Sequence, residues 1–484
     1  MVFLETALGQ LTTNPIVTLS IASIFLVLCQ CVYRCTFHPL AHIPGPLLAK
    51  LTSLWLHYHA CIGDEATVIH EAHKRYGPLV RVSPREVDIA DADAIAPIYI
   101  SKGGFPKAPC YANFDIDGHK TIFSTEDTEY RAPRAKSIMP LFSTKSIKDN
   151  EAAIYSCVDN MVKRMQEEAR TAAPVNILNL ARSLALDVVS THLFRENYNG
   201  TSEKGGRLSA SAFVDAYVAV GRFFYLSNTV FSWLSWIIDK YFSDERTEIS
   251  MGVVDKFVRK LVESTPKDAQ NYPGRMLNLG LSKPEVIAQC KDLMFAGTDS
   301  TGMNLATICR QLVLHPDKYE KLRREIMSNS GPEKQEIQGL PYLSAVVKEG
   351  LRISMANPTR LPHIVPPGGW TFKSTYFPPG SIVGCSAYEL HFNENAFPNP
   401  FEFKPERWLE GHETSEANKN WFAFGAGSRA CIARNLATIE LYMGVERVVE
   451  SDVLRGAKVC QDEVELYEWF NASVKGEKME LIWS

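Results

Sequence analysis

The chain has 484 residues, enough for one large enzymatic domain or for two smaller ones. Hydrophobic residues make up 45% and charged residues 22%, so a disordered or fibrous chain is excluded and a sizeable core is expected. The 51 basic and 55 acidic side chains leave a formal charge of -4, so no positive field is present to hold nucleic acid, and we expect no nucleic-acid partner.

The N-terminal segment is apolar. The stretch from Ile16 to Tyr33 has about the length needed to cross a bilayer, so we interpret it as a transmembrane helix within an anchor of residues 1–38. A cleaved signal peptide is the alternative, but residues 1–14 contain no Lys or Arg and no A-x-A type cleavage site follows. Basic residues begin at Arg34, which predicts a single-pass protein whose large C-terminal part is cytosolic.

A proline-rich hinge and a loop-rich region follow the anchor. Two prolines in the Pro-Gly-Pro of residues 44–46 fix φ, so we assign residues 39–46 to a stiff hinge and residues 47–484 to the functional domain. Residues 80–90 alternate apolar and polar side chains around a Ser-Pro turn, which predicts a β-hairpin. Residues 101–125 are rich in Gly, Pro and Asp and should form a loop.

Helical periodicity dominates residues 152–314. The clearest helix starts at Ser282, which forms a capping box with Glu285, and its roughly 30 residues would span about 45 Å, enough to run through an entire domain. A second helix is predicted for Pro341 to Ile353, and short strands are predicted within the Pro- and Gly-rich residues 357–420.

A glycine-bearing loop near the C-terminus carries one cysteine. Residues 424–433 (FGAGSRACIA) place Cys431 just before an apolar helical run over residues 432–448. The positive end of that helix and its unpaired N–H groups favour the thiolate, which is a good metal ligand. A buried cysteine after a glycine turn is also a common packing residue, so this loop alone leaves both interpretations open.

Two further patterns carry charge. Glu349 and Arg352 share one face of the second helix, and Arg407 in Pro-Glu-Arg-Trp is available to complete a buried charged network, although a solvated surface pair is the alternative. In the long helix, the small side chains of residues 296–301 (AGTDST) leave space in the middle of an apolar stretch. An acid beside two hydroxyls can relay protons there, but Ser and Thr inside a helix also bond back to the preceding turn.

The order and spacing of these motifs resemble the cytochrome P-450 superfamily over essentially the full chain. The sequence carries the small-Gly-x-acid-hydroxyl, Glu-x-x-Arg, Pro-Glu-Arg-Trp and Phe-x-x-Gly-x-Arg-x-Cys patterns in the family's order, and its anchor and hinge are similar to those of microsomal and fungal biosynthetic members. The resemblance implies a mainly α cytochrome P-450 fold with small β-sheets behind an N-terminal transmembrane helix. It also implies heme b as cofactor and the endoplasmic reticulum membrane as location.

The resemblance implies a role for each motif residue. Cys431 would be the axial haem iron ligand, with Phe424 shielding the sulfur and Gly427 letting the loop backbone approach it. The haem propionates would be bound by Arg429 and His363, and by Tyr130 and Arg134 of a Tyr-x-x-x-Arg pattern. Tyr130 stands where the family usually has Trp or His. Ala296 and Gly297 would lie beside the cofactor, and Glu349, Arg352 and Arg407 would hold the haem-binding core together.

Asp299, Ser300 and Thr301 would form the proton-delivery group. Ser300 stands where the family usually has threonine, so proton delivery should be looser, and Ala433 stands where glycine is usual. Retention of Asp299 favours a monooxygenase that activates O2 over a haem-thiolate isomerase or dehydratase that does not use O2. A non-catalytic haem carrier or sensor is the third hypothesis.

The resemblance also implies partners. Without a fused flavin domain, the electrons of NADPH would come from a membrane-bound NADPH-cytochrome reductase, with basic candidate contacts at Arg131, Lys136, Lys145, Lys419 and Arg434. The candidate substrate contacts are mainly apolar, which favours a hydrophobic small molecule such as a terpenoid, polyketide or alkaloid intermediate of secondary metabolism. These contacts are Phe105, Tyr111, Phe114, Phe223, Met294 and Phe295. The aromatic residues between 223 and 236 could equally contact membrane lipid: Phe223, Tyr225, Phe231, Trp233 and Trp236.

Overall fold

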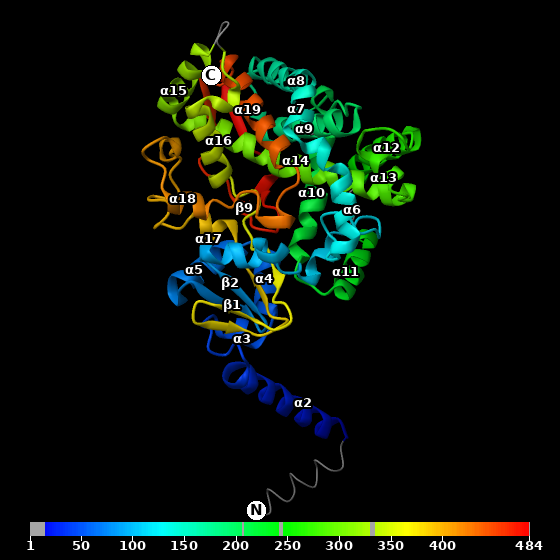
Figure 1. Ribbon diagram of the computed structural model, residues 1–484, viewed down its shortest axis with the longest axis vertical. Helices are drawn as coiled ribbons and strands as arrows, with labels where there is room; N and C mark the ends of the chain where they lie inside the picture. Colours follow the sequence, from blue (N-terminus) through cyan, green and yellow to red (C-terminus); the bar gives the residue numbers. More distant parts are fainter. Residues whose placement is uncertain (1–14, 206–207, 242–244, 330–333, 484) are drawn as a thin grey trace, which may run out of the picture.

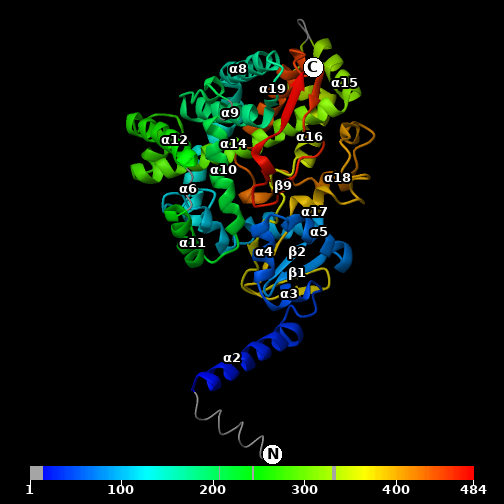
Figure 2. The same ribbon diagram turned by 180° about the vertical axis from the view of Figure 1, so that it is seen from behind.

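The computed structural model of the protein describes residues 15–205, 208–241, 245–329 and 334–483. Residues 1–14 of the predicted anchor lie outside the described residues. The described chain is mainly helical with small β-sheets, as predicted (Figures 1 and 2). Its helices are α2 (Pro15–Val32), α3 (Leu47–Leu51), α4 (Leu54–Ile62), α5 (Glu65–Tyr76), α6 (Thr128–Ile138), α7 (Thr144–Asp149), α8 (Glu151–Ala169), α9 (Ile177–Val189), α10 (Ser209–Val220), α11 (Asn228–Tyr241), α12 (Glu245–Ser264), α13 (Tyr272–Asn278), α14 (Lys283–Leu314), α15 (Pro316–Ser328), α16 (Pro341–Ile353), α17 (Ala387–His391), α18 (Ser415–Asn420) and α19 (Arg434–Glu450).

Short strands form sheets at the edges of the helical body. The largest described sheet has the order β1-β2-β7-β4, with β2 and β7 parallel and the other pairs antiparallel, and it includes the predicted hairpin of β1 and β2. The strands are β1 (Leu79–Ser83), β2 (Glu86–Ile89), β3 (Val175–Asn176), β4 (His363–Ile364), β5 (Trp370–Phe372), β6 (Thr375–Phe377), β7 (Ile382–Gly384), β8 (Ala457–Val459), β9 (Leu466–Tyr467), β10 (Ser473–Val474) and β11 (Glu480–Trp483).

Helix α2 extends away from the body beside α3 and the sheet of β1 and β2 (Figure 1). With the turn that continues it, the apolar stretch Ile16–Phe37 is long enough to cross a membrane, and none of its side chains is buried. The following Pro-Gly-Pro segment is fixed to β1, because the Arg81 N–H donates to the Pro44 carbonyl at 2.8 Å. A Cβ at Gly45 would lie 2.4 Å from the Arg81 carbonyl oxygen, so this contact requires glycine.

Helix α14 runs through the core. Ser282 and Glu285 form the predicted capping box, and its 32 residues span about 48 Å. Helix α9 packs closely along it, because Gly302 has no side chain and a Cβ there would lie 2.9 Å from the Arg182 Cα atom. These two helices share one large apolar cluster with α8, α16 and α19, so the core fixes the middle of α14 and the start of α19 relative to each other.

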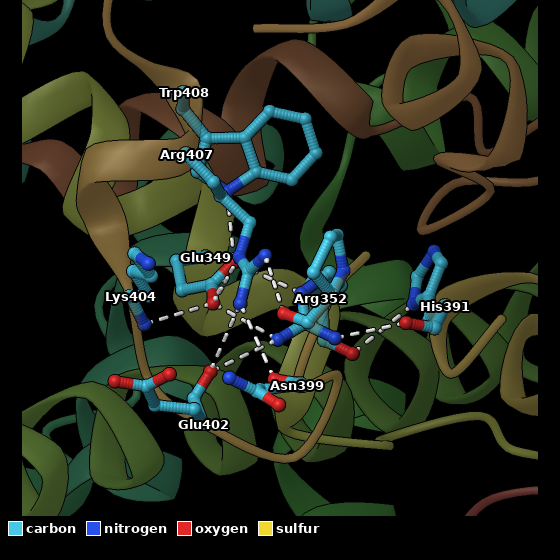
Figure 3. Close-up of polar contacts among 9 residues, drawn as sticks. Glu349, Arg352, His391, Asn399, Glu402, Lys404, Arg407 and Trp408 are labelled. Carbon is cyan, nitrogen blue, oxygen red and sulfur yellow. Dashed lines mark hydrogen bonds and ion pairs between the residues drawn. The ribbon is translucent and has the colours of Figure 1, made fainter. Parts of the chain in front are cut away.

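A fully buried carboxylate lies between α16 and the segment after α17 (Figure 3). Glu349 accepts two hydrogen bonds of 2.9 Å from Arg352, one of 3.0 Å from Arg407 Nε and one of 2.8 Å from Trp408 Nε1. The Lys404 N–H adds a fifth at 3.0 Å. The predicted buried network is therefore present, and the surface-pair interpretation is wrong.

The network extends to the cysteine loop through His391. Arg352 donates to the His391 carbonyl at 2.8 Å, and the His391 ring nitrogen Nδ1 lies 3.1 Å from the Arg352 carbonyl. Burial and the Arg352 charge lower the pKa of His391 to about 3, so the ring is neutral. Nδ1–H therefore donates to Arg352, and Nε2 accepts the Phe422 N–H at 2.9 Å. Phe422 lies two residues before Phe424, so the buried charges position the loop that carries Cys431.

We expect Glu349→Gln to lower the free energy of unfolding by about 3–5 kcal/mol, because it leaves Arg352 and Arg407 buried without their carboxylate. Urea unfolding followed by circular dichroism measures the change. Glu413→Gln is the matched control, since Glu413 pairs with Lys348 at the surface and its loss should cost less than about 1 kcal/mol. Equal effects of the two substitutions would show that the Glu349 network does not stabilise the fold.

Candidate functional site

The cysteine loop is held by its own backbone and by a neighbouring segment. The Cys431 N–H donates to the Phe424 carbonyl at 2.9 Å, and the Ser428 hydroxyl donates to the Gly103 carbonyl at 2.8 Å. Phe424 is half-buried and packs edge-on against Trp421, with ring centroids 5.9 Å apart. The loop therefore presents Cys431 at the start of α19, as the sequence predicted.

The Cys431 side chain is accessible, yet burial raises its thiol pKa. An accessible side chain that is also surrounded by protein faces an interior space rather than bulk solvent. The Ala433 N–H and the Arg434 charge lower the thiol pKa, which is the predicted effect of the helix start, but burial is the larger contribution. A metal ion bound to the sulfur would oppose the effect of burial and favour the thiolate.

Gly427 packs closely against a neighbouring segment. Its φ is +70°, and a Cβ at this position would lie 1.7 Å from the Tyr99 carbonyl oxygen. The glycine therefore lets the loop pack against residues 96–100. Tyr99 in turn donates its hydroxyl to the Leu361 carbonyl at 2.9 Å, which connects the cysteine loop to the segment before β4.

Three basic side chains and His363 gather near this loop. Arg429 donates to the backbone carbonyls of Thr125 and Glu126, and burial beside Arg131 lowers its pKa to about 10. Lys107 and Arg429 both act electrostatically on His363, and burial lowers the pKa of that histidine to about 4. Within the described ranges, no carboxylate lies within ion-pair distance of Lys107, Arg131 or Arg429.

Tyr130 and Arg134 contact each other and the loop before α6. Arg134 donates to the Tyr130 carbonyl at 2.8 Å and stacks over the Tyr130 ring at 3.5 Å, while the Tyr130 hydroxyl donates to the Lys120 carbonyl at 2.9 Å. The charge of Glu285, at the start of α14, raises the pKa of Tyr130, and the charge of Arg134 lowers the pKa of Glu285. On α6 it is Arg131, predicted as a reductase contact, that lies within electrostatic reach of Arg429.

The middle of α14 has one accessible face. Ala296 is exposed, and Ser300, one turn later on that face, is half-buried and donates its hydroxyl to the Ala296 carbonyl at 3.4 Å. Thr301 is only 4% exposed. A Cβ at Gly297 would lie 2.5 Å from Val189, so this glycine allows the approach of α9.

Asp299 belongs to a buried charge chain. Arg182 donates to Asp299 at 2.8 Å and to Asp215 of α10 at 2.8 Å, and Asn471 donates to the second Asp299 oxygen at 3.2 Å. Burial raises the pKa of Asp299, whereas the Arg182 charge lowers it. Both carboxylate oxygens accept a hydrogen bond, so Arg182 and Asn471 fix the orientation of Asp299.

The predicted substrate contacts separate into groups. Tyr111 and Phe114 pack with Phe224 and Phe470, with ring centroids 4.8–5.8 Å apart. Phe105 packs on Trp370 instead. Three further predicted contacts are half-buried or buried outside that cluster: Phe223 lies beside Arg222, Met294 is in the main core, and Phe295 stacks on Tyr217.

Among the predicted lipid contacts, Tyr225 is half-buried and donates its hydroxyl to Glu65 at 2.6 Å. Phe231 is also half-buried. Trp233 and Trp236 of α11 are 63% and 56% exposed. Helix α11 lies in the half of the body nearer to α2 (Figure 2). The two tryptophans are therefore free to meet an apolar surface.

These residues fit the haem that the resemblance implies. An accessible interior thiol supplies a soft axial donor for iron, and basic groups without carboxylate partners suit the two propionates. When bound, the haem supplies the oxidising chemistry of the site. Cys431 would bind its iron, Arg429 and His363 would face its acidic edge, and Phe424 would pack beside the sulfur.

Four residues near the site were not identified from the sequence: Arg182, Lys107, Arg131 (as a site residue) and Phe470. A signal existed for Arg182, because it is the lone cation of helix α9, whose residues are all buried, and a buried arginine needs a partner. Phe470 and Lys107 carry no such local signal, since their partners lie far away in the sequence.

We expect Gly427→Ala to lower the free energy of unfolding by about 3 kcal/mol, because a methyl group would overlap the Tyr99 carbonyl and strain the backbone. The haem content of the purified protein should fall with it. Gly411→Ala is the control: its φ of +81° is equally unsuited to alanine, but nothing lies within 4 Å of the new Cβ, so it should cost about 1–2 kcal/mol. Unchanged stability of the Gly427 variant would refute the contact.

Comparison with known proteins agrees with this geometry. The cytochrome P450 family profile matches residues 43–451. A cytochrome P450 monooxygenase of Annulohypoxylon moriforme, mfmF, is 36% identical, with 96% of this chain and 99% of the relative covered. The monooxygenase BOT1 of Botryotinia fuckeliana is 30% identical over 85% and 84% of the two chains, and the fusicoccadiene C-8 hydroxylase of Alternaria brassicicola is 29% identical over 85% and 84%. The chain therefore belongs to the cytochrome P450 family and is a cytochrome P450 monooxygenase.

Proposed function

We propose that this protein uses NADPH and O2 to oxidise a hydrophobic small molecule, an intermediate of fungal secondary metabolism, with heme b bound through Cys431. The observation that carries the proposal is the accessible, interior Cys431 thiol at the start of α19. A relative named as a fusicoccadiene C-8 hydroxylase supports hydroxylation of an apolar skeleton as the reaction class.

The apolar side chains around the site support a hydrophobic substrate. Tyr111, Phe114, Phe224 and Phe470 pack into one aromatic cluster, with Phe123 and Leu361 partly buried against it. Such a cluster offers ring faces and edges but few fixed hydrogen-bond donors, so it selects for apolar bulk and shape. Lys107, which contacts Tyr111 and Phe123, is the charged exception.

We propose residues 1–38 as the anchor in the endoplasmic reticulum membrane, residues 39–46 as a connection to it, and residues 47–484 as the cytosolic catalytic domain. The exposed apolar stretch Ile16–Phe37 supports a single span. Trp233 and Trp236 provide a second lipid contact, because exposed tryptophans are favoured where apolar and wet surroundings meet.

The electrons come from an NADPH-cytochrome reductase in this proposal. Lys136, Lys145 and Arg434 are exposed and are available to an acidic partner surface. Lys419 pairs with Asp93 at 2.6 Å, and Arg131 is half-buried near Arg429, so these two residues are weaker candidates.

Ser300 is the better placed of the two hydroxyls for moving a proton. It lies on the accessible face of α14, and its 3.4 Å bond to the Ala296 carbonyl is long for a hydroxyl donor, so the hydroxyl can turn to another acceptor at little cost. Thr301 is buried. Asp299 remains the acid of the group, with Arg182 holding its charge.

The test of the proposed function is incorporation of labelled oxygen. The protein, a microsomal reductase and NADPH should convert a hydrophobic terpenoid or polyketide into a product that carries one atom from isotopically labelled O2, measured by mass spectrometry. A product formed without NADPH and O2 would indicate an isomerase or dehydratase instead. Ligand binding without any NADPH consumption across such a panel would indicate a carrier or sensor.

We expect Ser300→Ala to raise the hydrogen peroxide released per NADPH consumed by severalfold, because reduced oxygen leaves as peroxide when proton delivery is impaired. Peroxide and NADPH are measured in the same assay. Thr301→Val is the control and should leave the ratio unchanged, since Thr301 is buried. The reverse pattern would assign the proton transfer to Thr301.

A further inference from the structure

The C-terminal half of α14 borders a cavity that the proposed haem site does not use. The cavity has a volume of about 170 Å³. Its wall is completed by the end of α16, by the segment that enters β9 and by the residue before β11. None of its lining residues is exposed on the surface, and none is a predicted haem or substrate contact. The cavity is therefore a candidate site of its own.

Met303, Thr307 and Arg310 form the α14 side of this cavity. Positions three or four residues apart share one face of a helix, so the three side chains lie in a row. Arg310 comes ten residues after Ser300, which corresponds to about 15 Å along the helix axis. Its charge is therefore well separated from the proton-delivery group.

Arg310 is a buried cation without an anion beside it, and it is only 9% exposed. Nη2 donates to the Gln461 carbonyl at 2.9 Å and to the Asp462 carbonyl at 2.6 Å. Nε is buried without a partner, and the accessible Nη1 donates no hydrogen bond to the described residues. In the part of the chain that the structure describes, no carboxylate lies within ion-pair distance of Arg310.

The charge of Arg310 has to be accommodated as it is. A guanidinium keeps its proton, so Arg310 does not escape the cost of burial by becoming neutral. Burial lowers its pKa, and the charge of Asp462 acts in the opposite direction. Asp462 is exposed, so water screens that charge. An anion bound at Nη1 would replace hydration that the guanidinium has lost.

The rest of the lining determines which anion fits. Five of the nine lining residues are hydrophobic, among them Met303 and Met479, which are 3% and 2% exposed, and the half-buried Leu466. Such a wall disfavours a strongly hydrated ion such as inorganic phosphate and suits a hydrocarbon group. A cavity of about 150 Å³ holds benzene, so this one has room for roughly six to nine non-hydrogen atoms.

We propose that this cavity binds a short-chain carboxylate. Its carboxylate accepts from Arg310, and its hydrocarbon part packs on Met303, Met479 and Leu466. The site goes beyond the proposed oxidation, because neither the haem nor a residue of the substrate contacts takes part in it. It is a second small-molecule site on the helix that also carries the proton-delivery group.

Calorimetric titration tests the charge recognition. Hexanoate and hexanamide, which has the same number of non-hydrogen atoms but no charge, are titrated into the full-length protein in nanodiscs. We expect hexanoate to bind at least tenfold more tightly, the effect of a charge-assisted hydrogen bond, and Arg310→Met to remove this preference. Arg324→Met is the matched control and should keep the preference, because Arg324 is exposed on α15.

Two further measurements locate the ligand. Thr307→Phe places a larger side chain in the cavity, so it should abolish binding of both hexanoate and hexanamide. The Soret band of haem-loaded protein should stay unchanged during the titration, because the carboxylate is bound far along α14 from the haem. If the protein takes up no haem, the proposed function fails, and the calorimetric test of this cavity still applies.

The proposal is overturned if the wild type binds neither hexanoate nor benzoate saturably, or if it shows no preference for hexanoate over hexanamide. A preference that survives in both Arg310→Met and Thr307→Phe would also overturn it, since the acid would then bind elsewhere. A Soret shift that follows hexanoate binding in Arg310→Met would place the acid in the substrate site and contradict the assignment to this cavity.

Discussion

The buried carboxylate of Glu349 is the interaction on which the rest of the site depends. A charge removed from water destabilises the fold unless every lone pair is used, and Glu349 accepts from two arginines, a tryptophan and a backbone N–H. The same Arg352 that pairs with Glu349 also fixes His391, and His391 accepts the Phe422 N–H. The position of the cysteine loop is thus determined by this buried network together with the close packing of Gly427 on the Tyr99 carbonyl.

A second constraint comes from the close approach of α9 and α14. Gly297 and Gly302 leave no room for a side chain against Val189 and Arg182. This approach brings Arg182 of α9 into contact with Asp299, the proposed acid of the proton-delivery group. The middle of α14 is therefore covered by α9 on one face. On its other face Ala296 and Ser300 stay accessible.

Most of the fold could be predicted because its signals are local. A capping box begins α14, alternation gives the hairpin of β1 and β2, and the spacing of Glu349 and Arg352 places both on one face of α16. The roles of residues on α6 were harder to predict, because consecutive residues point about 100° apart around the helix axis. The Tyr-x-x-x-Arg pattern predicts a role for Arg134, which stays a prediction, and it gives no sign that Arg131 lies within electrostatic reach of Arg429. Lys107 and Phe470 acquire their surroundings only through distant segments, which a local pattern does not reveal.

The central claim is that Cys431 provides the thiolate ligand of the haem iron. Its most direct test is the absorption difference spectrum of the dithionite-reduced protein with and without carbon monoxide, measured on the wild type and on Cys431→His. We expect a strongly red-shifted Soret band for the wild type and a band typical of histidine-ligated haem for the variant. A wild-type spectrum without the red shift, or a variant that keeps it, would contradict the assignment of Cys431.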